Sequence, residues 1–147
     1  MPIQLLTIVS ILLLASPPKE DRVKKEMDQL QGGWKSEVTV VDGAKRWTSL
    51  QFDGDAVTWQ NHIAQGRFNK ASVVKFTYKL DLSEKPPKID LTWAEFANKG
   101  KVDLGIYRLE GDKLTLCTSQ IGKERPQAFE AKEGSGHTLL HLERAKP

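Results

Sequence analysis

Three histidines and one cysteine are the side chains best suited to metal binding or nucleophilic catalysis in this chain. His137 and His141 share one face of a strand-like run, HTLLHLER, where two imidazoles four residues apart need a third converging ligand to hold a metal. His62 lies in WQNHIAQG, which we interpret as a loop. Cys117, in KLTLCTS, has no histidine near it in the sequence to act as its base, so we interpret it as a small buried strand residue. A single cysteine also excludes an intrachain disulfide.

Other chemical motifs are missing or incomplete. Asp53 and Asp55 in DGD are typical of the start of a calcium loop, but Val57 and Trp59 stand where further oxygen ligands are needed. The sequence contains neither the glycine-rich phosphate loop G-x-x-x-x-G-K nor the nucleophile elbow G-x-S-x-G. A fold can bring distant carboxylates together, but no spacing here favours a particular pair. We therefore expect a protein that is not an enzyme and has no metal site and no cofactor.

Composition indicates one globular domain without a basic surface for nucleic acid. Of the 147 residues, 39% are hydrophobic, enough for a core that folds without disulfides. The 22 basic and 19 acidic residues are interspersed, as in KEDRVKKEMDQ. Because nucleic-acid binders concentrate lysine and arginine on one face, we expect no nucleic-acid partner.

The chain opens with an apolar run from Ile3 to Ala15, which fits the hydrophobic region of a secretory signal. No lysine or arginine precedes the run, and Pro17 follows it where cleavage would occur. We interpret residues 1–16 as a signal peptide or an uncleaved N-terminal anchor, and residues 17–147 as the folded domain. We expect export to the periplasm, the cell envelope or the medium, with membrane association only through an uncleaved leader.

A short helix is predicted over residues 19–30, in KEDRVKKEMDQL. Val23, Met27 and Leu30 are spaced by four and three residues, so they fall on one helical stripe. Two glycines follow and end the helix.

The rest of the chain has the pattern of an antiparallel sheet with one dry face. Apolar and polar residues alternate in KFTYKLD, KIDLTW, KLTLCT and HTLLHLER, and more weakly in SEVTVV, WTSLQF, DAVTW and QAFEAK. Turn sequences lie between the runs, in VDGAK, FDGDA, LEGDK, KEGSG and SEKPPK. We predict an all-β fold, an antiparallel up-and-down barrel of roughly eight strands. Gly105, within VDLGIYRLE, indicates a bulge or bend, so the inward set could switch from Leu104 to Tyr107 and Leu109.

The stretch LQGGWK places Trp34 at the start of the first strand, directly after the predicted helix. This pattern resembles the lipocalin signature, in which the tryptophan closes the barrel floor and an arginine of the last strand lies over its ring. The matching arginine is Arg144 in HLERA. A guanidinium stacked on an indole gains cation–π energy and shields the ring, so Trp34 and Arg144 are the expected plug of the barrel.

Longer stretches carry a second resemblance. LQGGWKSEVTVVDG, FTYKLDLSEKPPKIDLT, GIYRLEGDKLTLC and GKERPQAFEAKEGSGHTLLHLER are similar to an uncharacterised lipocalin-like domain family abundant in planctomycete-type bacteria. The resemblance implies a lipocalin-like barrel and no catalytic residue. It also draws attention to Arg125 and Pro126 in KERPQAF, a recurrent motif of that family. The interpretation we favour is that Pro126 sets the turn entering a strand with Phe129, while Arg125 pairs with a nearby carboxylate. The alternative is that Arg125 points to the barrel mouth and meets an anionic ligand.

Four aromatic residues on alternating, inward positions decide whether such a barrel is hollow: Trp59, Phe76, Tyr78 and Trp93. The first hypothesis is that they line a cavity of at least about 300 Å³ for a small hydrophobic or amphipathic molecule. The second is a packed barrel, which we favour for the interior, acting as an interaction domain for a cell-envelope protein through an apolar patch or an open strand edge. The third is a hydrolase of unknown type, which needs a converging polar cluster.

Overall fold

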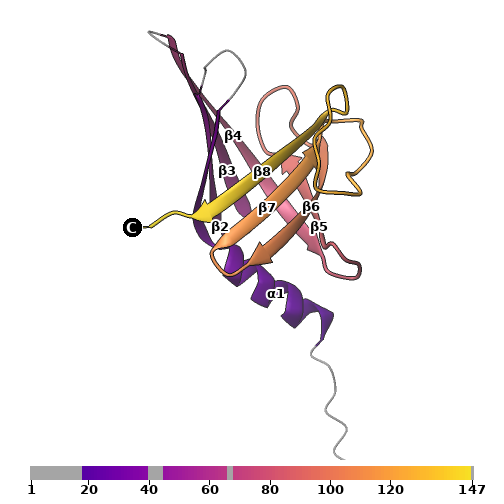
Figure 1. Cartoon of the computed structure of the whole chain (residues 1–147). Coiled ribbons are helices and arrows are strands. Elements are labelled where there is room, and N and C mark those ends of the chain that lie inside the picture. The colour runs from indigo at the N-terminus through magenta and orange to yellow at the C-terminus, as the bar shows by residue number, and fades with distance from the viewer. Residues whose placement is uncertain (1–17, 40–44, 66–67, 147) are drawn as a thin grey trace, which may run out of the picture.

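The computed structural model describes residues 18–39, 45–65 and 68–146, which form one helix and eight strands (Figure 1). The elements are α1 (Lys19–Leu30), β1 (Gly32–Thr39), β2 (Lys45–Asp53), β3 (Ala56–Gln65), β4 (Phe68–Asp81), β5 (Lys88–Trp93), β6 (Val102–Glu110), β7 (Lys113–Ser119) and β8 (His137–Arg144). Each strand pairs antiparallel with the next, and β8 pairs with β1 to close the barrel. The predicted up-and-down barrel and the predicted helix are therefore confirmed. The leader and the turn in VDGAK lie outside the described residues.

Helix α1 covers one end of the barrel, which we call the base; the opposite end is the mouth (Figure 1). Val23 and Met27 pack against the core and Leu30 is fully buried, as their spacing predicts. Glu20 and Asp21 lie in the first turn, where carboxylates interact favourably with the helix dipole. The helix therefore presents its apolar stripe to the barrel and its charged face to solvent.

Arg144 joins the helix, the first strand and the last strand at the base. Its guanidinium carbon lies 4.3 Å from the centre of the Trp34 ring. Its Nη1 and Nη2 donate to the backbone carbonyls of Gln31 and Gln29 at 3.0 and 2.8 Å, and its Nε donates to Asp112 Oδ1 at 2.9 Å. Because α1 has no basic residue in its own last turn, Arg144 supplies the positive charge that the helix C-terminus favours.

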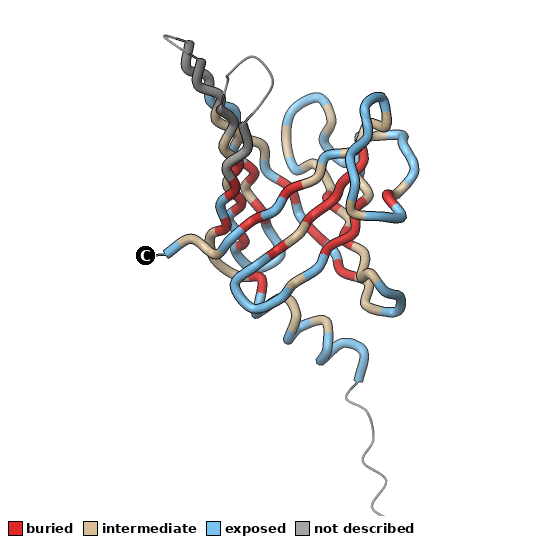
Figure 2. Tube along the Cα trace, in the orientation of Figure 1, coloured by how far each residue is buried: buried red, intermediate tan, exposed pale blue. Residues whose placement is uncertain are grey.

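Side chains fill the barrel interior above this base. Trp34 and Tyr107 are fully buried, and the Trp34 Nε1 donates to the Leu30 carbonyl at 2.9 Å. The Tyr107 hydroxyl donates to Glu26 Oε1 of α1 at 3.1 Å, and burial raises the pKa of this hydroxyl above its usual value. Most buried residues lie along the strands, whereas most loop residues and most of α1 are exposed or half-buried (Figure 2). The inward positions of the strands therefore form one continuous core.

His62 was expected in a loop, and this was wrong. It lies within β3, paired with Trp47 of β2, and the two rings meet edge to face with centroids 5.4 Å apart. The strand continues through this polar stretch because its inward neighbour, Asn61, is hydrogen-bonded inside the barrel by Thr48. Because Asn61 is polar but points inward, the stretch does not show the apolar–polar alternation that predicts a strand.

The run QAFEAK was expected to be a strand, and this was also wrong. It lies in the loop between β7 and β8, which folds over the outer face of the wall. There Pro126 is buried, as are the outward-facing side chains Ile106 and Cys117. The Cys117 thiol donates to the Glu130 carbonyl at 3.4 Å, and burial raises the pKa of the thiol. The run cannot join the sheet here because β7 already pairs with β6 and β8 on its two edges.

Gly105 lies in an unbroken strand, so the alternative of a bulge is wrong. It pairs with Ile89 on one side and Thr118 on the other, and the inward set runs through Asp103, Gly105 and Tyr107. A Cβ at this position would lie 3.0 Å from the Cys117 carbonyl oxygen and 3.1 Å from methyl groups of Ile89 and Thr118. Glycine is needed because the neighbouring strands leave no room for a side chain.

Gly105→Ala is expected to lower the free energy of unfolding by about 1–2 kcal/mol, because the added methyl group overpacks the wall. Urea denaturation followed by tryptophan fluorescence measures the change. Elsewhere, glycine to alanine at a compatible backbone position stabilises a protein by about 0.4–1 kcal/mol through the unfolded chain. An unchanged or higher midpoint would therefore show that the wall accommodates a Cβ.

Candidate functional site

A pocket of about 160 Å³ lies at the mouth, above the packed interior. We call it the mouth pocket. It is lined by Trp59, Asn61, Val74, Phe76, Trp93, Asp103, Thr118, Ser119, Gln120 and Thr138. These residues come from six strands of the wall and the start of the loop after β7. The pocket is therefore a property of the closed barrel and not of a single hairpin.

Three aromatic rings form one side of the mouth pocket. Phe76 and Trp93 are directly opposed in the β4–β5 ladder, with ring centroids 5.0 Å apart and near edge-to-face geometry. Trp59 lies next to Phe76 at 6.2 Å. Aromatic pairs at these separations attract each other beyond their burial of apolar area, so the rings form a fixed wall.

Hydrogen bonds hold the polar edges of both indoles. Trp59 Nε1 donates to Asn61 Oδ1 at 3.1 Å, and the Thr48 hydroxyl donates to the same oxygen at 3.0 Å. Trp93 Nε1 donates to Asp103 Oδ1 at 3.1 Å. Each ring is therefore oriented by an inward polar partner, and the rings present carbon surface to a ligand.

Asp103 is the one charged residue among the described residues that line the pocket. Burial raises the pKa of its carboxyl group above the usual value, and the hydrogen bond from Trp93 opposes that rise. Within the described parts of the chain, no lysine, arginine or histidine forms an ion pair with it. The mouth pocket thus combines an aromatic wall with one half-buried carboxylate.

Tyr78, a predicted lining residue, lies at the base and not at the mouth. Its hydroxyl donates to the Gly54 carbonyl at 3.0 Å and accepts from Gln31 Nε2 at 3.2 Å. Its ring meets Phe52 edge to face at 5.1 Å. Burial raises the pKa of the Tyr78 hydroxyl, and the hydrogen bond from Gln31 opposes this. Tyr78 belongs to the contacts that close the base.

Arg125 lies on the outer face of the wall and does not line the mouth pocket. Its Nη2 makes an ion pair with Asp90 Oδ1 at 2.6 Å, and its Nη1 donates to the carbonyls of Gly105 and Ile89 at 2.8 and 3.3 Å. The alternative of an anion-binding arginine at the mouth is therefore wrong. The guanidinium instead ties the loop after β7 to strands β5 and β6.

Sequence reasoning named Trp59, Phe76 and Trp93 and missed the other lining residues. Among those missed, Asp103 and Asn61 are the ones that accept hydrogen bonds from the indoles. Asp103 was recoverable: counting back by twos from the inward Tyr107 reaches it through Gly105. A bulge at Gly105 would have reversed that count. Asn61 offered no such pattern, because an inward polar residue is indistinguishable in sequence from an outward one.

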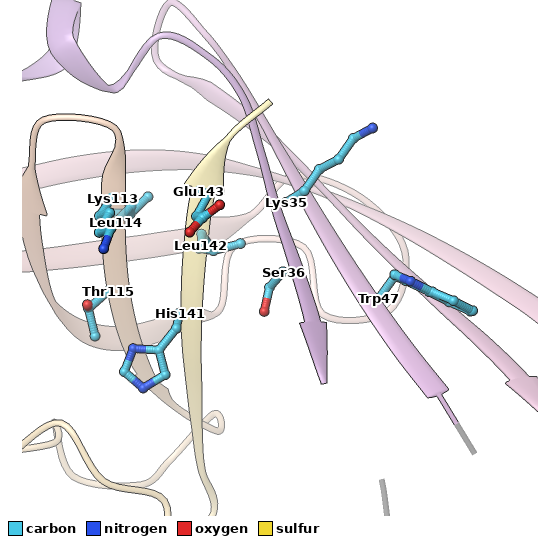
Figure 3. Close-up of a pocket in the computed structure, with 9 residues that line it drawn as sticks. All are labelled: Lys35, Ser36, Trp47, Lys113, Leu114, Thr115, His141, Leu142 and Glu143. Atoms are coloured by element: carbon cyan, nitrogen blue, oxygen red, sulfur yellow. The ribbon is translucent and has the colours of Figure 1, made fainter. Parts of the chain in front are cut away.

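A second, larger groove lies on the outer wall between β1 and β8 (Figure 3), with a volume of about 580 Å³. Its lining consists of Lys35, Ser36, Trp47, Lys113, Leu114, Thr115, His141, Leu142 and Glu143. Within the described residues β1 and β8 pair only at Trp34–Arg144 and Lys35–Glu143, whereas β3 and β4 pair at ten positions. Figure 3 shows the two strands diverging beyond these pairs. We call this groove the seam.

Among the described residues, no three histidine, cysteine, aspartate or glutamate side chains gather as a metal site would require. Helix α1, the one helix of the described ranges, is not long and apolar enough to span a membrane.

No family model, curated protein or solved structure matches the chain. The fold is therefore assigned from the architecture, in which eight antiparallel strands in sequence order form a closed barrel above one short helix. This is consistent with a lipocalin-like barrel.

Proposed function

We propose that this chain is an exported, non-enzymatic lipocalin-like protein that binds a small molecule at the mouth of its barrel. We place it in the lipocalin-like family abundant in planctomycete-type bacteria, on the resemblance of its strand and turn sequences. The mouth pocket, with its oriented aromatic wall, is the observation that carries the binding role. Because the interior below the pocket is filled, the ligand enters only the mouth.

The size of the pocket limits what fits in it. Its volume of about 160 Å³ is smaller than the cavity of at least about 300 Å³ that we expected for an enclosed hydrophobic ligand. A head group or a single ring fits this volume, and the rest of a longer molecule extends into solvent. The rings are held before a ligand arrives, so binding loses little free energy to ordering side chains.

The proposal predicts saturable binding of small ring compounds at the mouth. Titration of the ¹⁵N-labelled domain with a set of single-ring fragments should shift the backbone amides of Trp59, Phe76 and Trp93. Trp93→Leu keeps an apolar side chain but removes the aromatic face. It should weaken binding about five- to tenfold, which is the change in affinity that corresponds to the free energy of one aromatic contact.

Phe96→Ala is the matched control. Phe96 is 72% exposed, in the loop between β5 and β6, and does not line the pocket, so its loss should leave affinity within about twofold. If no fragment produces saturable shifts at the mouth, the proposed function is wrong.

The seam favours a second candidate function, strand addition by an extended segment of another envelope protein. The edge of β8 that faces β1 has no described partner there from His137 to Leu142. Open strand edges accept extended peptides. Trp47 lines the seam on the outer face, and tryptophan is enriched at protein interfaces. The ¹⁵N-labelled domain can be titrated with envelope extract in place of the ring fragments. Shifts of backbone amides along β1 and β8 would support this candidate, and shifts confined to the mouth would contradict it.

A further inference from the structure

We infer that the mouth pocket takes a small organic cation, an ammonium group carrying short alkyl substituents. The inference rests on the proposed binding function and names its ligand class. Two features carry it: the inward carboxylate of Asp103 and the aromatic wall of Trp59, Phe76 and Trp93.

The carboxylate is the first step. Asp103 occupies an inward position of β6, directly opposite the buried Leu91 of β5. A charged group that faces the inside of a barrel is unfavourable unless it is paired. Its one hydrogen bond from a described side chain comes from the neutral Trp93 indole, and no described basic residue pairs with it. An ammonium ligand would supply the missing positive charge.

The aromatic wall is the second step. Cations are attracted to the faces of tryptophan and phenylalanine rings, and cages of such rings recognise quaternary ammonium groups. Both indole N–H groups are already engaged, one by Asn61 and one by Asp103. The rings therefore offer a ligand their carbon surface and not a hydrogen-bond donor. An alkylated ammonium gains from both features, since its alkyl groups contact the rings while its charge faces Asp103.

The same features argue against other ligand classes. An anion would meet the Asp103 carboxylate with no basic side chain among the described lining residues to offset it. A neutral molecule would fill the pocket but leave Asp103 unpaired. The remaining described lining residues are apolar or carry only amide or hydroxyl groups, so Asp103 is the sole titratable group there.

The test compares two probes of the same shape that differ in charge. Choline and 3,3-dimethyl-1-butanol have the same branched end, positively charged in choline and neutral in the alcohol. Isothermal titration calorimetry on the whole folded domain should show choline binding at least about tenfold more tightly, equivalent to one cation–π contact with a desolvated ring. Equal affinity for the two probes would overturn the inference and leave the proposed function standing. If neither these probes nor the ring fragments bind, both are wrong.

Asp103→Asn tests the role of the carboxylate. Asparagine has the same shape and keeps an oxygen to accept the Trp93 N–H, so we expect folding to be retained. The variant should bind choline about tenfold more weakly and bind the neutral alcohol as before. Glu95→Gln is the matched control, because it removes one carboxylate from the loop between β5 and β6 without touching the pocket lining. If Glu95→Gln lowers choline affinity as much as Asp103→Asn does, the effect is one of overall charge and the inference fails.

Two further measurements distinguish a binding role of the Asp103 carboxylate from a structural one. Choline affinity should fall as the pH falls through the pKa of Asp103, which burial raises, since the protonated group has no charge. In Asp103→Asn this pH dependence should vanish. The variant should also be more stable than the parent at neutral pH, and the difference should shrink in acid, because a raised folded-state pKa means that ionisation destabilises the fold as pH rises. A less stable variant at neutral pH would show that the carboxylate serves folding.

Choline groups occur free and as lipid head groups, and the experiment distinguishes the two sources. Co-sedimentation with vesicles of dioleoylphosphatidylcholine measures head-group binding, while the calorimetry measures the free cation. Saturable calorimetric binding without co-sedimentation supports a free ligand. Co-sedimentation that Asp103→Asn abolishes supports the lipid source.

Discussion

Replacing Trp34 with alanine should lower the free energy of unfolding by about 3–5 kcal/mol, the range for removing a large buried aromatic side chain. The ring is fully buried and lies beneath the Arg144 guanidinium at 4.3 Å. The substitution also removes the N–H that donates to the Leu30 carbonyl at the end of α1. A loss of this size is a large fraction of the 5–15 kcal/mol typical of whole domains, so we expect the variant to be partly unfolded near 37 °C.

Urea denaturation followed by far-ultraviolet circular dichroism measures this loss without relying on the tryptophan signal. Trp47→Ala is the control, since Trp47 is only half-buried on the outer wall, and it should lower stability by about 1 kcal/mol or less. Trp34→Phe should fall between the two, because it keeps one aromatic ring in place but loses the N–H bond and part of the buried ring volume. If Trp34→Ala is no more destabilising than Trp47→Ala, the indole does not close the base.

The base of the barrel was accessible from the sequence because strong local patterns specify it. The stripe of Val23, Met27 and Leu30 marked the helix. The alternation of KIDLTW and KLTLCT marked strands, and glycines after acidic residues marked the turns at Gly54 and Gly111, both with positive φ. Each of these features depends on residues close together in the chain.

The mouth was less accessible because alternation specifies a face and not a height. Phe76 and Tyr78 are both inward on β4 and both buried. Two residues along a strand span about 7 Å, so one ring reaches the mouth pocket while the other contacts Gln31 at the base. Separating the two required the register of β4 against its neighbours, which the sequence pattern does not contain.

The loop after β7 shows a different limit. Apolar and polar residues alternate in QAFEAK, yet Phe129 lies under the Arg108 guanidinium at 4.6 Å on the outer wall. Phe129 is the one residue of this run that is half-buried, and the other five are exposed. A loop that packs on a sheet through single residues can therefore show a strand-like alternation over a few positions. Arg125 is placed by the same packing, through Asp90 and two backbone carbonyls that are far from it in sequence.

Arg144→Leu should lower the free energy of unfolding by about 2–3 kcal/mol, although the arginine side chain is one-third exposed. The loss comes mainly from two charge-assisted hydrogen bonds to the Gln29 and Gln31 carbonyls and from the stacking on Trp34. The ion pair to the exposed Asp112 adds little because solvent screens it.

Three measurements distinguish the loss of these hydrogen bonds and of the stacking from a general loss of positive charge. Arg108→Leu removes an exposed arginine that stacks on Phe129 and should lower stability by about 1 kcal/mol or less. Arg144→Lys keeps the charge but not the planar fork, so it should recover less than half of the loss. Amide hydrogen exchange should show α1 opening before β3 and β4 in Arg144→Leu, since the arginine holds the C-terminus of the helix. Uniform exchange in all elements would mean that Arg144 stabilises the barrel as a whole and does not anchor α1.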